Sequence, residues 1–426
     1  MLWARCLRAQ PASNRRTVPR VLIAWELGAQ LGHVLRILGV ARELRERGAA
    51  VLIAVRDLRA ASATLAQHGF ACVQAPWMPA PSSEAAPEPP GYGGILAACG
   101  FGEVSSLRAL VQGWDSLIEL FSPQVLLADH APSALLAARM RALPAAQIAL
   151  GFELPPATVP LPVLRPWTAH RPADILAQEA RLLGVINALC RERGASGLDR
   201  LADLYASAAP LLATVPELDH FGAREGGQYV GPLFTLDDGE AALWPQADHP
   251  GKRMFVYLRP GPAAEHALAA IGRRVAADAG VQVIAAVPGL RREMAAQFHG
   301  ERFAVHVNPV RARVALTADL AITNGGHGLT AAALLAGVPL LALPTHVEQW
   351  MLARRVQQLG AGVFLNPNQV ETGFAAALGA MLTDDKYRQA ALAFAAHHAG
   401  VDQGATLRRI ADEIERISAA PAACAG

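Results

Sequence analysis

The chain has 426 residues, more than one hydrophobic core usually supports, and this length predicts two domains. Hydrophobic residues make up 52% of the chain and charged residues 17%, which excludes an intrinsically disordered protein. The formal net charge is +2, so no strong field of one sign points to nucleic acid or an anionic membrane as a partner.

The N-terminal segment is treated separately from the fold. Residues 1–20 contain five arginines and no acidic residue, and they lack the apolar stretch of a secretory signal. We expect residues 1–19 to be a disordered leader, with a targeting peptide as the alternative.

Short apolar runs then alternate with amphipathic segments. Residues 21–25 predict a strand, residues 33–48 a helix with one apolar face, and residues 50–55 a second strand. A glycine-containing loop joins the first two, so this is a βαβ unit, which predicts a parallel sheet with helices on both faces. Further strands are expected at 70–73, 125–128, 145–150 and 211–214, helices at 103–121, 133–143, 173–193 and 198–207, and a surface loop at 75–90.

The alternation begins again after residues 236–252, a polar and turn-rich stretch that we interpret as a linker. Strands are expected at 254–258, 281–286, 303–307, 320–323 and 340–343, helices at 263–278, 291–298, 328–335 and 347–359, and consecutive helices from 370 to 417. This predicts two doubly wound α/β domains: 20–235, and 253–426 with C-terminal helices. Ligands bind such sheets at the carboxyl ends of the strands, and we expect the cleft between the two domains to hold the site.

A glycine-rich turn lies between a predicted strand and a predicted helix in the second domain. Glycines let a ligand approach the backbone, and a helix N-terminus offers unpaired N–H groups and the positive end of a dipole. These properties suit a diphosphate, with a tight turn that binds nothing as the alternative. The expected diphosphate-binding residues are Asn324, Gly325, Gly326, His327, Gly328 and Thr330.

The next predicted strand ends near Pro344, and a helix follows with Glu348 and Gln349 in its first turn. An adjacent carboxylate and amide are suited to binding sugar hydroxyls. The alternative is that both side chains cap the helix and interact with its dipole.

These motifs resemble the donor-binding signature of the UDP-glycosyltransferase-like (family 1) glycosyltransferases. The residues that carry the resemblance are Asn324 to Thr330, Gly337 to Pro339, Pro344, Glu348-Gln349 and Arg355 to Gly360, with Gly32-His33, Leu44 and Arg47-Gly48 matching the start of the acceptor domain. The resemblance covers residues 21 to 406. It implies the GT-B fold, two Rossmann-like domains facing across a cleft, with a nucleotide-diphospho sugar, usually linked to UDP or dTDP, bound by the C-terminal domain. It also implies catalysis without a metal or other cofactor.

The chain departs from the family pattern at two places. Asn324 stands where the family usually has a histidine that contacts the phosphates, and residues 307–310 lack the tryptophan that often stacks on the base. His327, three residues after Asn324, is a candidate to compensate. Arg259, at the end of a predicted strand, is a weaker candidate for a phosphate contact.

His33 is the candidate catalytic base. It follows a glycine in the first strand–helix loop, and a histidine titrates in the range that suits removal of a proton from an acceptor hydroxyl. Asp129 ends the predicted strand 125–128 and is positioned to orient His33, and the resembled family has a His–Asp pair at these two places. Strand alternation directs Asp129 and His130 to opposite sides, so only one of them should reach His33.

Other features are less specific. The five cysteines lie far apart without a CxxC pair, which predicts reduced thiols, no disulfide, no zinc site and a cytoplasmic location. The longest apolar run, 331–344, is too short for a membrane span.

His397-His398 has no metal-ligand partner at a suitable spacing and is expected at the surface. Six aromatic residues form either an apolar acceptor wall or ordinary packing: Trp77, Tyr92, Phe101, Trp114, Phe152 and Trp167.

Together these features predict an inverting, metal-independent glycosyltransferase of hexosyltransferase type. The donor would be a UDP- or dTDP-sugar and the acceptor a hydroxyl of a small or lipidic molecule, with no nucleic acid partner. A sugar-nucleotide epimerase can use the same architecture and is one alternative. A degenerate homologue that serves as a non-catalytic partner subunit is another alternative. It is consistent with Asn324, which replaces the histidine that is usual in the family.

Overall fold

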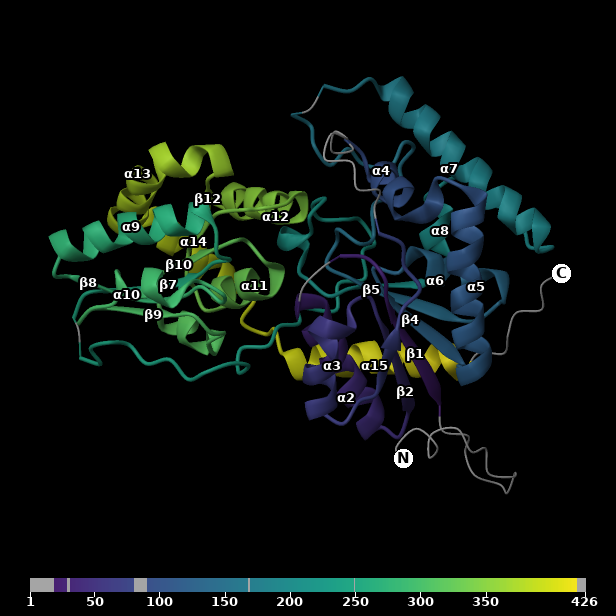
Figure 1. Ribbon diagram of the computed structural model, residues 1–426, viewed down its shortest axis with the longest axis horizontal. Helices are drawn as coiled ribbons and strands as arrows, with labels where there is room; N and C mark the ends of the chain where they lie inside the picture. Colours follow the sequence, from purple (N-terminus) through teal and green to yellow (C-terminus); the bar gives the residue numbers. More distant parts are fainter. Residues whose placement is uncertain (1–18, 29–30, 80–89, 168, 249, 420–426) are drawn as a thin grey trace. The chain divides into compact units, whose positions relative to one another are not determined.

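The computed structural model describes residues 19–28, 31–79, 90–167, 169–248 and 250–419, which form two α/β units (Figure 1). The expected leader lies almost entirely outside these residues, as does most of the expected loop at 75–90. The first unit contains the chain up to Ala213, residues 228–230 and the segment from Gly404 onward. The second contains Thr214–Gly227 and Gly231–Gln403.

This division differs from the expected domain boundaries at two places. The polar stretch 236–252, expected to be a linker, lies inside the second unit, because the chain first changes unit between Ala213 and Thr214. The last helix, α15 (Gln403–Ala419), belongs from Gly404 onward to the first unit. The apolar side of α15 accounts for this assignment, because Ile410, Ala411 and Ile414 are fully buried.

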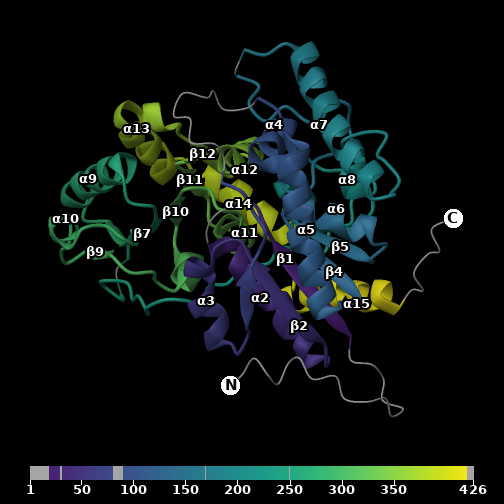
Figure 2. The same cartoon turned by 45° about the vertical axis from the view of Figure 1, so that its right-hand side comes forward.

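The first unit is built on a six-stranded parallel sheet in the order β3-β2-β1-β4-β5-β6. Figures 1 and 2 show α2 and α3 together on one face and α5 and α6 on the other. The elements are β1 (Arg20–Trp25), α2 (Leu31–Glu46), β2 (Ala50–Val55), α3 (Leu58–Gln67), β3 (Cys72–Gln74), α4 (Tyr92–Leu96), η1 (Ala97–Phe101), α5 (Val104–Phe121), β4 (Val125–Asp129), α6 (Pro132–Met140), β5 (Ala145–Ala149), α7 (Pro172–Glu192), α8 (Asp203–Ala206) and β6 (Ala209–Leu212).

The second unit repeats this architecture with the order β12-β11-β10-β7-β8-β9, again all parallel. Its elements are η2 (Pro216–Leu218), β7 (Lys252–Tyr257), α9 (Pro262–Ala277), β8 (Val281–Ala286), α10 (Arg292–Ala296), β9 (Phe303–His306), η3 (Ala312–Thr317), β10 (Leu320–Thr323), α11 (His327–Leu335), β11 (Leu340–Ala342), α12 (Val347–Gln358), β12 (Gly362–Phe364), η4 (Pro367–Gln369), α13 (Val370–Thr383) and α14 (Lys386–His397).

The sheet of the second unit is buried on both faces, as expected for a parallel sheet. Successive residues of β7 enter different cores: Met254 and Val256 pack with α9 and α13, whereas Phe255 packs with α11 and α12. This explains why its strands read as continuous apolar runs rather than as alternating ones.

Most expected elements are confirmed, and four differ among the α-helices and strands that the structure describes. The helix expected at 198–207 shortens to α8 (Asp203–Ala206), because the stretch before it forms turns. Helices α3 and α4 and strand β12 are present although the sequence did not lead us to predict them.

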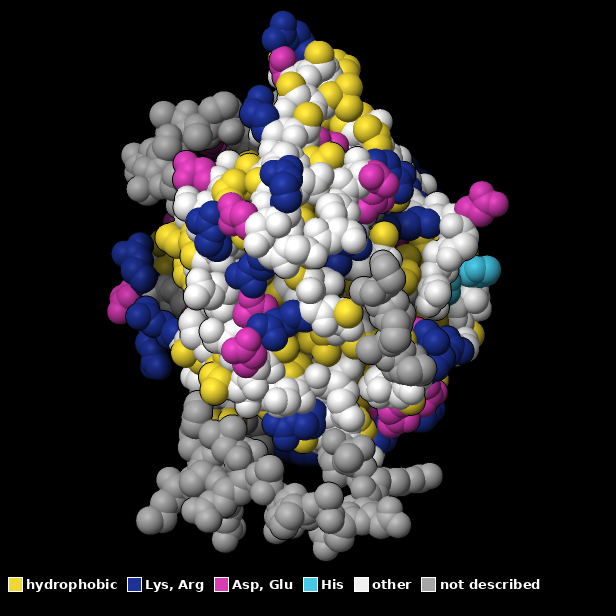
Figure 3. All heavy atoms as spheres, turned by 90° about the vertical axis from the view of Figure 1, so that its right-hand side faces the viewer, with side chains coloured by type: hydrophobic (Ala, Val, Ile, Leu, Met, Phe, Trp, Pro, Cys, Tyr) yellow, Lys and Arg dark blue, Asp and Glu magenta, His cyan; other side chains and the backbone are white. Residues whose placement is uncertain are grey.

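The surface and the helix lengths bear on possible partners. Figure 3 shows basic and acidic side chains interspersed on one face of the molecule. Among the residues that the structure describes, no single helix has the length and apolarity to cross a bilayer. Tyr92–Phe101 and Val104–Phe121 meet that test only as a pair, and the chain bends by 75° between them.

Candidate active-site residues in each unit

His33 lies in the first turn of α2, directly after the loop that leaves β1. Its ring stacks on the indole of Trp25, with a centroid distance of 5.3 Å. Gly28 makes room for it. A Cβ atom added to Gly28 would lie 2.4 Å from His33 Nε2, and the backbone of Gly28 has a φ of +84°, which side chains rarely adopt.

His33 and Asp129 are in direct contact. His33 Nδ1 lies 3.0 Å from Asp129 Oδ1, and both side chains are buried. Because a carboxylate only accepts, we assign the proton to Nδ1, which leaves the Nε2 lone pair available as an acceptor. His130 has a left-handed backbone and approaches Tyr92 OH at 3.3 Å instead. The expectation that one of these two neighbours reaches His33 therefore holds geometrically, and the one that reaches it is Asp129.

Arg36 and Glu153 complete this cluster, and neither was among the expected site residues. Arg36 donates to both carboxylate oxygens of Asp129, at 3.1 and 2.5 Å, and to Glu153 Oε1 at 3.0 Å. Its Nη2 is also 3.0 Å from His33 Nδ1, and since both nitrogens carry protons, Asp129 is their shared acceptor. Arg36 lies three residues after His33, on the same helix face, which was the signal in the sequence. Glu153 comes from an irregular segment whose sequence gives no such signal.

The charges of this buried cluster depend on one another. Burial alone would raise the pKa of Asp129, but the positive charges of Arg36 and His33 outweigh it and lower that pKa. Burial would lower the pKa of Arg36, and the carboxylates of Asp129 and Glu153 raise it instead. His130 has no such compensation, and burial lowers its pKa to about 4, so it is neutral at physiological pH.

In the second unit, the glycine-rich turn follows β10 as expected. Gly326 is exposed and is the N-cap residue of α11, with no side chain capping the helix. Asn324 is engaged with the backbone on both sides: its Oδ1 accepts from Arg259 N at 2.8 Å, and its Nδ2 donates to Leu343 O at 2.8 Å. Asn324 thus ties the ends of β7 and β11 to that of β10.

The remaining residues of this turn lie beneath its surface. His327 is buried, and its Nε2 lies 2.7 Å from the Thr214 hydroxyl. Thr330 is buried as well, and a Cβ added to Gly328 would approach Phe234 Cβ to 3.3 Å. These three positions therefore hold the turn in place, while the backbone at Gly326 is what the turn exposes.

Glu348 and Gln349 occupy different environments in the first turn of α12. Gln349 is buried, and its Oε1 accepts from both the backbone N and the hydroxyl of Thr345, at 2.9 and 3.0 Å. Its side-chain oxygen is therefore used in bonds to Thr345, the residue that precedes the N-cap residue, His346. The side chain of Glu348 is 28% exposed, and its Oε1 lies 4.0 Å from His220 Nε2.

Two histidines near Glu348 were not expected from the sequence. His346 precedes α12, and burial lowers its pKa, partly offset by the charge of Glu348. Arg259, at the end of β7, also has a pKa lowered by burial and partly restored by Glu348. The carboxyl ends of β7, β10 and β11 thus bring Arg259, the exposed turn and Glu348 to one edge of the sheet.

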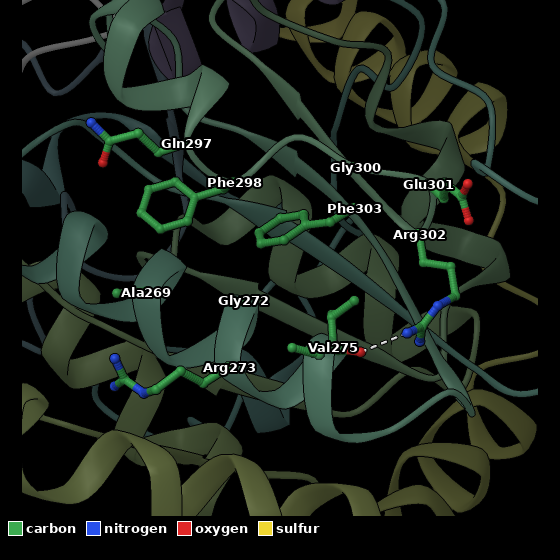
Figure 4. Close-up of a pocket in the computed structure, with 11 residues that line it drawn as sticks. Ala269, Gly272, Arg273, Val275, Gln297, Phe298, Gly300, Glu301, Arg302 and Phe303 are labelled. Atoms are coloured by element: carbon green, nitrogen blue, oxygen red, sulfur yellow. Dashed lines mark hydrogen bonds between the residues drawn. The ribbon is translucent and has the colours of Figure 1, made fainter.

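A pocket elsewhere in this unit is a poor candidate for the site. It lies between α9 and the segment just before β9, with Phe298 and Phe303 beside it and Arg302 bonded to the Val275 carbonyl (Figure 4). These residues border the amino end of β9, whereas ligands of parallel α/β sheets bind at the carboxyl ends.

Comparison with known proteins identifies the family. Residues 271–408 match the family model described as the erythromycin biosynthesis protein CIII-like C-terminal domain. The chain is 30% identical over 306 residues to a PGL/p-HBAD biosynthesis glycosyltransferase of Mycobacterium tuberculosis (strain ATCC 25177 / H37Ra), covering 68% of this chain and 70% of that relative. The chain belongs to the UDP-glycosyltransferase-like, family 1 glycosyltransferases.

Other relatives of this glycosyltransferase agree. A PGL/p-HBAD biosynthesis rhamnosyltransferase of Mycobacterium bovis (strain BCG / Pasteur 1173P2) is 27% identical over 313 residues, covering 70% of this chain and 69% of the relative. The spinosyn rhamnosyltransferase SpnG, solved with its aglycone, superposes with a TM-score of 0.64 at 21% identity, over 92% of this chain and 100% of SpnG. The glycosyltransferase therefore has the GT-B fold. SpnG has also been solved with thymidine diphosphate.

The expected aromatic wall of the glycosyltransferase is largely ordinary packing. Tyr92, Phe101 and Trp114 are fully buried, so they belong to the core of the first unit. Trp77 and Trp167 remain exposed, at 37% and 54%.

His33, Asp129 and Glu153 offer ligand atoms that lie within 4.8 Å of one another, a spacing that suits a metal ion. The Arg36 guanidinium already bonds to both carboxylates, and it supplies the positive charge of this cluster.

Proposed function

We propose that the protein is an inverting glycosyltransferase that moves a sugar from a UDP- or dTDP-sugar to a hydroxyl of a small or lipidic acceptor. The contact between His33 and Asp129 carries this proposal, because it leaves Nε2 of a buried imidazole as a proton acceptor. The relatives support a sugar transfer, and the thymidine diphosphate bound by SpnG supports a nucleotide diphosphate as the leaving group.

His33 acts as the base in this proposal. Its Nε2 takes the proton of the acceptor hydroxyl while the hydroxyl oxygen bonds to the anomeric carbon and the bond from that carbon to the diphosphate breaks. With a neutral imidazole, the carboxylates of Asp129 and Glu153 outweigh the single charge of Arg36. Once His33 has taken the proton, the cluster is electrically balanced, so it stabilises the imidazolium that the reaction forms.

The second unit binds the donor. The N–H groups at the start of α11 and the backbone of Gly326 hold the diphosphate, aided by the positive end of the helix dipole and by Arg259. Asn324, His327, Gly328 and Thr330 shape this turn. Glu348 accepts hydrogen bonds from sugar hydroxyls, and Gln349 holds the first turn of α12 beneath it. No metal ion is required in this scheme, because the leaving charge is met by N–H groups and a guanidinium.

The test is transfer by His33→Ala with UDP- and dTDP-sugars and a panel of phenolic and aliphatic alcohols. Transfer should fall ~10²-fold or more, while nucleotide binding, measured by calorimetry, stays unchanged. His266→Ala in the second unit is the control and should keep full activity. Unchanged transfer in His33→Ala would remove His33 as the base.

The same assay without an acceptor addresses the two alternatives. An epimerase would isomerise the donor sugar when no acceptor is present, and a glycosyltransferase would leave the sugar unchanged. Calorimetric titrations that stay flat with every nucleotide would favour the non-catalytic subunit.

A further inference from the structure

Three potential metal ligands meet at the end of α14 in the second unit. His398 Nε2 lies 3.1 Å from Glu217 Oε2, and His397 Nε2 lies 3.7 Å from Glu217 Oε1. Glu217 belongs to η2 and precedes His398 by 181 residues. No metal-ligand partner stands at a suitable spacing from the two histidines in the sequence, and the fold supplies one.

The spacing of these atoms fits a small divalent ion. The ligand atoms of all three residues lie within 4.8 Å of one another. A tetrahedral zinc ion with bonds of about 2.0–2.1 Å holds its ligand atoms about 3.4 Å apart. We propose that Glu217, His397 and His398 bind a divalent transition-metal ion, best matched by zinc, with water completing the coordination.

An ordinary ion pair would not need this arrangement. One imidazole suffices to pair with a carboxylate, and His398 already does so with its ring packed on Phe394 at 4.5 Å between centroids. His397 is 73% exposed, yet its Nε2 faces the same carboxylate. Two imidazole nitrogens and one carboxylate whose ligand atoms lie this close together are a recurrent set for zinc and related metals.

The ion would stabilise the segment Thr214–Gly227, which contacts residues of the proposed donor site. The Glu217 carbonyl accepts from Arg355 of α12 at 3.1 Å, and His220, three residues further on, lies 4.0 Å from Glu348. The ion is thus a structural clamp on Thr214–Gly227 and takes no part in the transfer. Its existence does not rest on the proposed function.

The experiment is a calorimetric titration of the metal-free full chain with zinc chloride at about pH 7.5, where imidazole nitrogens are mostly unprotonated. One saturable site is expected. His397→Ala removes one ligand but leaves the bond between His398 and Glu217, so the fold is kept while zinc affinity falls at least about tenfold. Glu217→Gln should have the same effect, and His299→Ala, which removes another exposed histidine, should have none.

Hydrogen exchange locates the ion. Zinc should slow amide exchange in Thr214–Gly227 of the wild-type chain and leave it unchanged in His397→Ala. Absence of saturable binding, wild-type affinity in His397→Ala and Glu217→Gln, or unchanged exchange in this segment would each overturn the assignment. None of these measurements uses a sugar donor, so a negative result leaves the proposed transfer untouched.

Discussion

His33 and Asp129 are separated by 96 residues in the chain, yet their Nδ1 and Oδ1 atoms lie 3.0 Å apart. The sheet brings them together. Strands β1 and β4 are parallel neighbours, and Trp25, the last residue of β1, is paired with Asp129, the last residue of β4. The first turn of α2 therefore holds His33 beside the end of β4, where the carboxylate of Asp129 and the guanidinium of Arg36 are in contact.

The balance of charge in this cluster predicts the effect of Glu153→Gln. The substitution removes one negative charge that faces the imidazolium, while Asp129 and Arg36 stay in contact with His33. The imidazolium that forms when His33 takes the proton is then less well stabilised, so kcat should fall while the affinity for the nucleotide stays unchanged. His130 also faces the cluster, but burial lowers its pKa to about 4, so it adds no charge at physiological pH.

Asp129→Asn is the comparison variant for Glu153→Gln. It removes the carboxylate that accepts from His33 Nδ1 and so holds the imidazole in one tautomer. This variant should lose transfer by ~10²-fold or more at every pH, because the tautomer as well as the charge is lost. If Glu153→Gln transferred sugar as fast as the wild type, the charge-balance account would be wrong.

Most of the fold could be predicted from the sequence, because its strands and helices follow from local patterns of apolar and polar residues. β10 was predicted to the residue, and the His–Asp pair followed from two strand ends and a family resemblance. Features set by distant contacts were missed. β12 has only three residues and includes Gly362, where an added Cβ would lie 2.2 Å from the Leu340 carbonyl oxygen, so it is defined by its neighbour rather than by its own sequence.

The candidate site was predictable only in part for the same reason. A glycine-rich turn indicates a helix N-terminus, but it does not say which side chains point outward. Asn324, His327 and Thr330 face the protein interior in the structure. Likewise, no pattern in the sequence connects Glu153 to Arg36 or Glu217 to His398.

Glu26 predicts a dependence of stability on pH. It is completely buried; its Oε2 accepts from Ser133 N at 2.9 Å, and its Oε1 has no bond within the described part of the chain. Burial raises its pKa from 4.5 to about 7. Between these values the folded state keeps a proton that the unfolded state has released. The free energy of unfolding should therefore fall as pH rises from 4.5 to about 7, by up to ~3 kcal/mol, and this residue should add no further change above that.

Glu26→Gln provides the check, because glutamine can still accept from Ser133 but cannot ionise. Urea unfolding at several pH values between about 4.5 and 8 should show that the wild type loses this stability and the variant does not. Parallel curves for the two proteins would mean that Glu26 is not buried as described.

The docking of α15 on the first unit should depend on apolar burial more than on charge. Arg47 bonds to Asp412 at 2.6 Å, but that carboxylate is 66% exposed, and such pairs contribute at most ~1 kcal/mol. Ile414 is fully buried, and its truncation should cost ~2–5 kcal/mol. We therefore expect a much larger fall in the unfolding midpoint for Ile414→Ala than for Arg47→Ala, measured by urea titration at moderate salt. Equal effects would assign the docking to the ion pairs.

Gly28→Ala tests whether the space beside His33 Nε2 is needed for catalysis. The added methyl group would lie 2.4 Å from Nε2, so it must displace the imidazole or block the side from which an acceptor hydroxyl approaches. Transfer should fall sharply in kcat, while the affinity for the nucleotide stays the same, because we propose that the other unit binds it. Backbone strain alone would also perturb the protein, because Gly28 has a φ of +84°.

Gly48→Ala separates the two effects. Gly48 has a φ of +94°, and an added Cβ there would meet nothing within 4 Å, so this variant carries similar strain without touching the imidazole. It should lose stability of ~1 kcal/mol and keep its transfer rate. Equal losses of kcat in Gly28→Ala and Gly48→Ala would show that strain, and not the space beside Nε2, limits the reaction. A loss confined to Gly28→Ala would show that the reaction needs the position of the imidazole and the space beside its Nε2 that Gly28 provides.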